Sequence, residues 1–235
     1  MKGEDIIKQV IHHSWDLSES QAITLQKELA LKVVKEDQID QVNYIAGVDV
    51  AYSKSSDRLV AAVVILDAVT LKIVESNVVE DNSDFPYIPG LFSFRELPPV
   101  IKAFSKISIT PDLIVCDGQG IAHPRRFGLA SHLGVLFNTP TIGCGKTKLI
   151  GESEEPGQRR GEYAILTDQS EDVGITLRTQ NNIKPVYVSI GHRITLPTAC
   201  KWVLRIAPRF RLPETTRQAD QLVNKYLAYL ENNRV

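Results

Sequence analysis

The sequence predicts an α/β protein whose mixed central sheet combines an antiparallel meander with parallel strands and is flanked by helices. Apolar runs rich in Val and Ile at 45–52, 60–67 and 72–80 are joined by short turns, which is the pattern of antiparallel neighbours. The chain then alternates strand-like and helix-like segments, which implies parallel pairing across helical crossovers. A length of 235 residues, of which 43% are hydrophobic, suits a single domain over residues 1–235.

The other elements follow from local patterns. Residues 4–36 have helical periodicity, and Ser18 followed by Gln21 predicts a capping box at the second helix of this stretch. These N-terminal helices would precede a core at about 43–232. After the meander we expect helices at 91–106, 125–137, about 197–206 and about 215–232, and strands at 113–117, 140–144, 162–167, 173–178 and 185–190. This order of elements is the plan of a ribonuclease H-like fold.

Composition bounds the location and redox state of the protein. No apolar run is long enough to span a bilayer, and the segment MKGEDIIKQVIHHSW lacks the apolar core and cleavage site of a signal peptide. We therefore expect a cytoplasmic protein with no membrane contact. A monomer is the default expectation for its assembly. Cys116, Cys144 and Cys200 are widely spaced in apolar surroundings, which predicts reduced, buried thiols.

Charge is spread unevenly along the chain. The formal net charge is −1, but residues 141–235 carry 14 Lys+Arg against 10 Asp+Glu, and the rest carries 13 against 18. Between residues 184 and 217 the only acid is Glu214, whereas the basic side chains are Lys184, Arg193, Lys201, Arg205, Arg209, Arg211 and Arg217. A local basic surface of this kind suits a phosphate backbone, although a solvated helix face explains any one of these side chains.

Three acids predict a metal site. Asp49 lies inside the apolar run 45–52, Asp117 follows the run 113–116, and Glu96 lies in the helix expected after the meander. An ionised carboxylate in such a run is costly to bury unless a cation offsets its charge. Oxygen ligands without a His/Cys cluster suit Mg²⁺ or Mn²⁺ rather than zinc. Either aspartate alone is equally compatible with a residue that caps a turn.

A rigid aromatic tip precedes one of these acids. In the run PYIPGLFSFRELP, Tyr87 stands between Pro86 and Pro89, whose fixed φ angles stiffen the backbone. A stiff aromatic or apolar tip can enter a gap between stacked bases. The alternative is a proline-bounded loop whose tyrosine packs on its own protein.

These features occur within six ordered motifs, and together the motifs resemble the endonuclease V family from about residue 20 to residue 230. The motifs are GVDVAY, PYIPGLFSFRELP, CDGQGIAHPRRFGLASHLGV, GCGKTKL, GHR at 191–193, and RLPETTRQAD. The resemblance implies a ribonuclease H-like endodeoxyribonuclease that uses Mg²⁺, with Mn²⁺ as a substitute. It implies a repair enzyme that hydrolyses the second phosphodiester 3′ to deoxyinosine in DNA and leaves a 3′-OH and a 5′-phosphate.

The resemblance also assigns roles to individual residues. It implies that Asp49, Glu96 and Asp117 bind metal and act in catalysis, that Asp220 is a fourth metal ligand, and that Lys146 acts near the scissile phosphate. It further implies that the PYIP loop fills the gap left by the extruded base. We expect the following residues to contact the DNA or the lesion: Pro86, Tyr87, Ile88, Pro89, Gly90, Gly118, Gly120 and His123. The glycines would let backbone amides approach the base closely.

Other functions remain open on the sequence. The enzyme could act mainly on inosine in RNA or single strands. A non-catalytic nucleic-acid-binding module is a second alternative, but its acids would repel phosphate without a metal. An ATP-dependent enzyme of related fold is disfavoured, because Ala51 and Tyr52 follow Asp49 where Gly and Thr would hold ATP phosphates.

Overall fold

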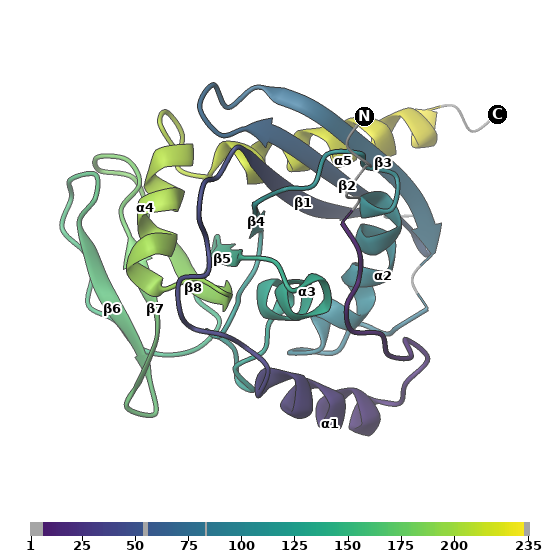
Figure 1. Cartoon of the computed structure of the whole chain (residues 1–235), viewed down its shortest axis with the longest axis horizontal. Coiled ribbons are helices and arrows are strands. Elements are labelled where there is room, and N and C mark those ends of the chain that lie inside the picture. The colour runs from purple at the N-terminus through teal and green to yellow at the C-terminus, as the bar shows by residue number, and fades with distance from the viewer. Residues whose placement is uncertain (1–6, 54–55, 83, 233–235) are drawn as a thin grey trace.

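The computed structural model describes residues 7–53, 56–82 and 84–232, and its centre is a mixed eight-stranded sheet (Figure 1). The strand order is β3-β2-β1-β4-β5-β8-β7-β6. The strands are β1 (Tyr44–Tyr52), β2 (Arg58–Asp67), β3 (Ile73–Asn82), β4 (Leu113–Cys116), β5 (Thr141–Gly145), β6 (Tyr163–Asp168), β7 (Glu171–Leu177) and β8 (Val186–His192). The predicted fold class is confirmed.

The pairing of β1 to β5 follows the prediction. β1, β2 and β3 form the antiparallel meander, and the turn between β2 and β3 is fixed by Asp67, whose Oδ1 accepts hydrogen bonds from the N–H groups of Val69 and Thr70. β4 pairs in parallel with β1 and with β5. β8, β7 and β6 then extend the sheet with antiparallel pairing.

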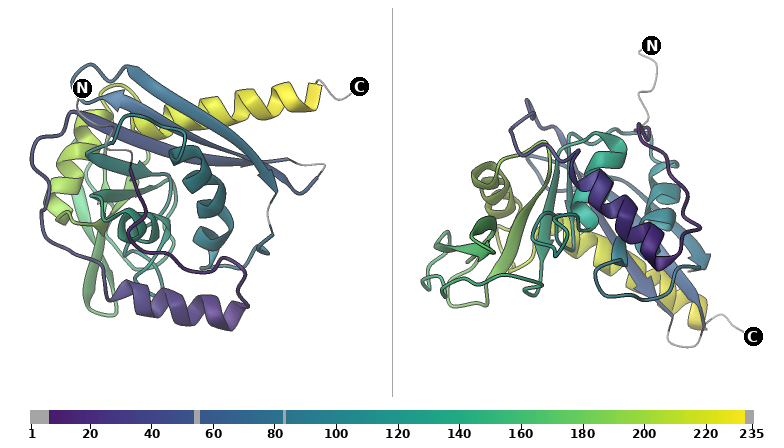
Figure 2. Two further views of the ribbon diagram at one scale, coloured as in Figure 1. Left: turned by 45° about the vertical axis from the view of Figure 1, so that its right-hand side comes forward. Right: turned by 90° about the horizontal axis from the view of Figure 1, so that it is seen from below.

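Helices cover both faces of the sheet. The helices are α1 (Glu19–Ala30), α2 (Phe92–Phe104), α3 (Leu129–Phe137), α4 (Leu196–Ile206) and α5 (Glu214–Asn232). α2 and α3 bury one face in a core that includes Val48, Phe104 and Ile114. α4 and α5 lie on the opposite face, α5 along the meander and α4 over the β7–β8 side, while α1 packs outside α3 (Figure 2).

A close approach brings α5 onto β1. A Cβ on Gly47 would lie 2.4 Å from the carbonyl oxygen of Thr215, so only glycine lets the first turn of α5 contact the strand at this point. Side chains alternate between faces along a strand, so Asp49 shares the face of Gly47. The same close contact therefore places α5, which carries Asp220, beside Asp49.

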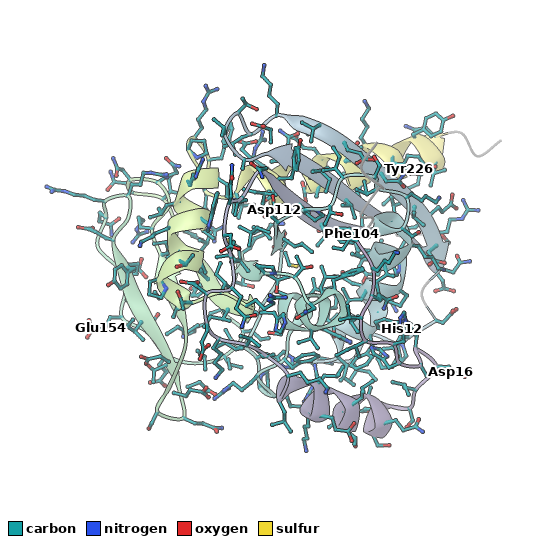
Figure 3. The ribbon with its side chains drawn as sticks, in the orientation of Figure 1. His12, Asp16, Phe104, Asp112, Glu154 and Tyr226 are labelled. Carbon is teal, nitrogen blue, oxygen red and sulfur yellow. The ribbon has the colours of Figure 1, made fainter. Side chains whose placement is uncertain are left out.

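The carboxylate of Asp112 sets the start of β1. Its Oδ2 accepts hydrogen bonds from the N–H groups of Asn43 and Tyr44, at 2.8 and 3.0 Å. Figure 3 shows Asp112 where the segment that precedes β1 enters the sheet. Since β4 begins at the next residue, this contact fixes the two parallel strands relative to each other.

The N-terminal prediction is only partly right. Ser18 forms the predicted capping box with Gln21, but α1 is the single helix within residues 7–36. Residues 7–18 run without regular structure and alternate between more buried and exposed positions, which is the period of an extended chain. Ile7, Ile11 and Trp15 pack against the core at intervals of four residues, and this spacing imitated a helix. Residues 1–6 lie outside the described part of the chain.

Other boundaries and the thiols can be compared in the same way. The helix expected at 125–137 begins only at Leu129, because residues 125–128 form an irregular loop. Cys116, Cys144 and Cys200 are free and buried, as predicted. Within the described residues, no helix combines the length and the apolarity that crossing a membrane would need.

Candidate active site

The predicted acids come from separate elements that meet at one region of the sheet. β1 and β4 are parallel and pair Val48 with Cys116, so Asp49 and Asp117 follow paired residues on neighbouring strands. Glu96 comes from the second turn of α2, and Asp220 comes from α5. Lys146 follows β5, the other neighbour of β4. The topology thus explains why residues far apart in the sequence become neighbours.

The charged groups make direct contacts at this point. Lys146 Nζ lies 2.5 Å from Asp117 Oδ2 and 3.9 Å from Asp220 Oδ1. The Tyr52 hydroxyl donates a hydrogen bond of 3.0 Å to Glu96 Oε1, and Glu96 is buried. The Arg95 guanidinium stacks 4.9 Å from the centre of the Tyr52 ring. Tyr52 therefore orients the most buried acid of the cluster.

The acids perturb one another's ionisation. Burial, followed by the charge of Asp117, raises the pKa of the Asp49 carboxyl to about 7. Burial also raises the pKa of Glu96 well above its usual value, and the charges of Asp49 and Asp117 add to the rise. Burial raises the pKa of Asp117 as well, although Lys146 opposes that rise. The three carboxylates form a cluster of excess negative charge that one ammonium partly offsets.

The donor set fits a hard divalent cation, although it is not arranged as a finished cage. Within the described ranges, no three His, Cys, Asp or Glu side chains stand close enough to hold one ion as they lie. The Lys146 ammonium, and not a second carboxylate, faces Asp117. Carboxylate oxygens that raise each other's pKa values are nevertheless the ligands that Mg²⁺ and Mn²⁺ prefer. The residues that would hold such an ion are Asp49, Glu96 and Asp117, with Asp220 beside them.

A cavity of about 410 Å³ extends from these charges to the PYIPG loop, by which we mean residues 86–90. Its lining includes Asp117 and Lys146 of the charged cluster and Tyr87, Ile88 and Pro89 of the loop. The Tyr87 side chain is 70% exposed and meets Phe92 edge-on, with ring centres 6.1 Å apart. The tyrosine is thus presented at the rim of the cavity and is not packed into the core.

The structure gives the predicted glycines different surroundings. The N–H of Gly118 donates to Cys116 O at 3.0 Å, and the N–H of Gly120 donates to Ser189 Oγ at 2.8 Å. A Cβ on Gly120 would lie 1.9 Å from Ile190 O, so packing against β8 requires this glycine. Gly118 and Gly90 line the cavity. Of the three amides, only that of Gly90 has no hydrogen-bond partner in the described part of the chain.

His123, His132 and His192 each form hydrogen bonds within the protein. His123 lines the cavity, but its Nδ1 accepts a hydrogen bond from Arg125 N and its Nε2 donates to Gly90 O. Burial, assisted by the charge of Arg125, lowers the His123 pKa to about 4, so the ring is neutral. His192 joins Val34 N to the Asn138 side chain, and the buried His132 contacts Ser93 and His13.

Two further residues hold the backbone at Lys146 and Thr147, and the sequence did not reveal their roles. Arg211 Nη2 donates to Lys146 O at 2.6 Å, and Gln119 Nε2 donates to Thr147 O at 3.0 Å. Consecutive carbonyls beside the lysine are thus fixed from two directions. Both residues lie inside recognised motifs, CDGQG and RLPETTRQAD, but the sequence does not reveal which backbone atoms they contact.

Comparison with known proteins agrees with this site. Residues 27–221 match the family model described as Endonuclease V. The chain belongs to the endonuclease V family. A relative named Endonuclease V from Nostoc sp. is 51% identical over 213 residues, which cover 90% of this chain and 96% of the relative. The resemblance predicted from the six motifs is therefore confirmed, and the protein is an endonuclease of this family.

Solved structures of family members have the same fold. Endonuclease V from Streptomyces avermitilis superposes with a TM-score of 0.89 at 45% identity, covering 94% of this chain and 98% of that one. Endonuclease V from Ciona intestinalis, solved with a 24mer DNA containing an inosine followed by a ribo-adenosine, gives a TM-score of 0.80 at 30% identity. That match covers 90% of this chain and 98% of the Ciona chain.

The raised pKa of Asp49 predicts how the stability of the metal-free enzyme depends on pH. The folded pKa of about 7 exceeds the ordinary value of 3.8, so the stabilising contribution is complete below the ordinary pKa and is lost as the pH rises through about 7. In a chelating buffer, Asp49→Asn should melt at a higher temperature relative to wild type at about pH 8 than at about pH 5. Calorimetry measures both differences. Equal differences at the two pH values would contradict the assignment.

Proposed function

We propose that this protein is a single-domain, divalent-metal-dependent endodeoxyribonuclease that recognises deoxyinosine in DNA. It hydrolyses the second phosphodiester bond 3′ to the lesion and leaves a 3′-OH and a 5′-phosphate. The observation that carries the proposal is one cavity whose lining includes both Asp117 and Lys146 of the charged cluster and an exposed, proline-bounded tyrosine. Membership of the endonuclease V family and the inosine-containing DNA bound by the Ciona relative support it.

Hydrolysis needs an activated water and relief of negative charge on the phosphate. A bound Mg²⁺ or Mn²⁺ would supply Lewis-acid polarisation and a lower pKa for water. Asp49, Glu96 and Asp117 would hold that ion, with Asp220 beside them. The ammonium of Lys146, which pairs with Asp117 here, reaches a phosphate oxygen through rotation of its side chain. Arg211 and Gln119 keep the backbone of this lysine in place.

Recognition requires the base to leave the helix, because its pairing edge is hidden inside a duplex. Tyr87 fills the gap by stacking, which offsets part of the cost of extrusion. Hypoxanthine presents an O6 acceptor where adenine presents an amine. The N–H of Gly90, at the cavity wall, can donate a hydrogen bond to O6. With adenine, the same N–H would meet the N6 amine, which is also a donor, and both groups would stay unpaired.

A second candidate substrate is inosine in RNA or in single strands. The DNA bound by the Ciona relative has a ribonucleotide after its inosine, which supports including such substrates. A panel of oligonucleotides should contain deoxyinosine, uracil, abasic and mismatch sites, together with inosine in single-stranded RNA. We expect the fastest Mg²⁺-dependent nicking with deoxyinosine in DNA. A faster reaction with the RNA would assign the second substrate class.

Removal of one cluster carboxylate should separate binding from cleavage. In Asp117→Asn with Mg²⁺, we expect nicking of an inosine-containing duplex to fall by about a thousandfold, because an amide neither balances the cation's charge nor holds Lys146 electrostatically. Binding of the duplex should remain measurable by fluorescence anisotropy. Lys106→Met, which changes an exposed lysine just after α2 and outside the cavity lining, serves as the control. Full nicking activity in Asp117→Asn would remove the metal-site assignment.

Truncation of the exposed tyrosine should affect the lesion complex selectively. Tyr87→Ala should weaken binding of the deoxyinosine duplex by about tenfold, because one base–aromatic stacking contact is lost. Binding of the undamaged duplex, in which no base is extruded, should change little. Tyr163→Ala, an exposed tyrosine on β6, is the matched control. Equal losses on both duplexes would contradict the role of Tyr87.

A further inference from the structure

The last residue of the PYIPG loop is held through its carbonyl oxygen. Gly90 O accepts hydrogen bonds from three side chains, namely Gln26 Nε2 at 3.0 Å, His123 Nε2 at 3.0 Å and Arg125 Nη2 at 2.7 Å. A carbonyl oxygen has two lone pairs, so three donors more than fill its capacity to accept hydrogen bonds. This peptide oxygen is therefore fixed toward the protein interior.

Gln26 completes this network from α1. Its side chain is only 1% exposed, and its Nε2 also donates to Phe127 O at 2.8 Å. Its Oε1 accepts a hydrogen bond from Arg125 Nε. Both donor hydrogens and the acceptor of this buried amide are thus paired, which permits one orientation only. Gln26 joins α1, the loop before α3 and the PYIPG loop.

The rest of the PYIPG loop is fixed at the same point. The N–H of Leu91, which belongs to the same peptide unit as Gly90 O, donates to Ile88 O at 2.9 Å. Gly90 has φ +80°, and a Cβ there would lie 2.6 Å from Arg125 Nη2. The positive φ favours glycine, and a Cβ would also push the end of the Arg125 side chain away from Gly90 O. This end of the loop is thus held by several contacts at once.

The other end of the loop is held as well. Arg95 Nη1 donates to Phe85 O at 2.7 Å, and the buried Phe85 ring packs 5.7 Å from the Phe94 ring. Tyr87 thus stands on a short span between two fixed points. A side chain on such a span enters a complex without paying much to become ordered.

We propose that Gln26 is a positioning residue for lesion recognition. It fixes Gly90 O and thereby holds the PYIPG loop in the conformation from which Tyr87 enters the DNA duplex. The inference rests on the proposed role of Tyr87. It adds α1 to the recognition machinery, although Gln26 lies one residue outside the segment that matches the family model. Gln26 acts through the backbone of Gly90 and does not take part in bond cleavage.

The test uses Gln26→Met, which keeps the length of the side chain and removes its hydrogen bonds. Single-turnover nicking of a deoxyinosine duplex gives the half-saturating enzyme concentration and the maximal rate, and competition gives the affinity for undamaged duplex. We expect the half-saturating concentration to rise about tenfold, with the maximal rate and the competitor's affinity within about twofold. Gln38→Met, at an exposed glutamine, is the matched control and should match wild type.

Combination with Tyr87→Ala distinguishes positioning from general damage. In that background, Gln26→Met should change the half-saturating concentration by less than about twofold, since the two substitutions remove the same advantage. The inference would be overturned if Gln26→Met raised the half-saturating concentration as much in the Tyr87→Ala background as in the wild type. Equal losses of affinity for damaged and undamaged duplexes would also overturn it. If Tyr87→Ala alone has no effect, the proposed recognition role fails and the inference fails with it. If Tyr87→Ala has its effect and Gln26→Met has none, only the inference fails.

A second variant covers the case in which Gln26→Met does not fold. Gln26→Glu retains an acceptor for Arg125 and loses both donors, so it should raise the half-saturating concentration at least as much. Thermal melting by circular dichroism sets the temperature at which all variants are folded during the assay. A Gln26→Glu protein with wild-type selectivity would also overturn the inference.

Discussion

The repulsion between carboxylates that are wholly or largely withdrawn from water at the meeting point of β1 and β4 is the constraint on which the rest of this structure depends. Two parallel strands in register place Asp49 beside Asp117, and α2 adds Glu96. Water cannot fully solvate these charges, and their pKa values rise as a result. Lys146 and the Tyr52 hydroxyl offset only part of this cost. A site of this kind is unfavourable until a cation enters it, which is the physical reason for reading it as a metal-dependent centre.

The surrounding residues divide into those that carry charge and those that hold loops in place. Arg211 and Gln119 fix the backbone beside Lys146, and Gln26 fixes the end of the PYIPG loop. These contacts are made to carbonyl oxygens, so they constrain the main chain and not the side chains of Lys146 and Tyr87. The cavity is therefore bordered by anchored backbone at both loops, and its lining includes Lys146 and Tyr87. Anchored backbone of this kind suits the discrimination between two similar bases that we propose.

Much of the fold could be predicted because its signals are local. The runs that form β1 and β4 are apolar, and one acid lies inside the first and one directly follows the second. The sequence also predicts α2, even though Pro98 and Pro99 remove two backbone donors from its interior. Its buried face outweighs that loss. The prediction of a helix before α1 was wrong because the four-residue spacing of Ile7, Ile11 and Trp15 also fits an extended chain in which every second inward-facing residue contacts the core. Gln26 and Arg211 could not be assigned, since a polar residue's partner depends on tertiary contacts. The same reason hid the contact of Gly120 with β8.

The most direct test of this account is a calorimetric titration of the metal-free protein with Mn²⁺ near neutral pH, repeated in two buffers of different ionisation enthalpy. Because the Asp49 carboxyl has a pKa of about 7, an entering cation must displace bound protons. The account predicts saturable binding with proton release, and loss of both in a protein carrying Asp49→Asn and Asp117→Asn together. Unchanged Mn²⁺ binding in that double variant, or no saturable binding to the wild-type protein, would contradict it.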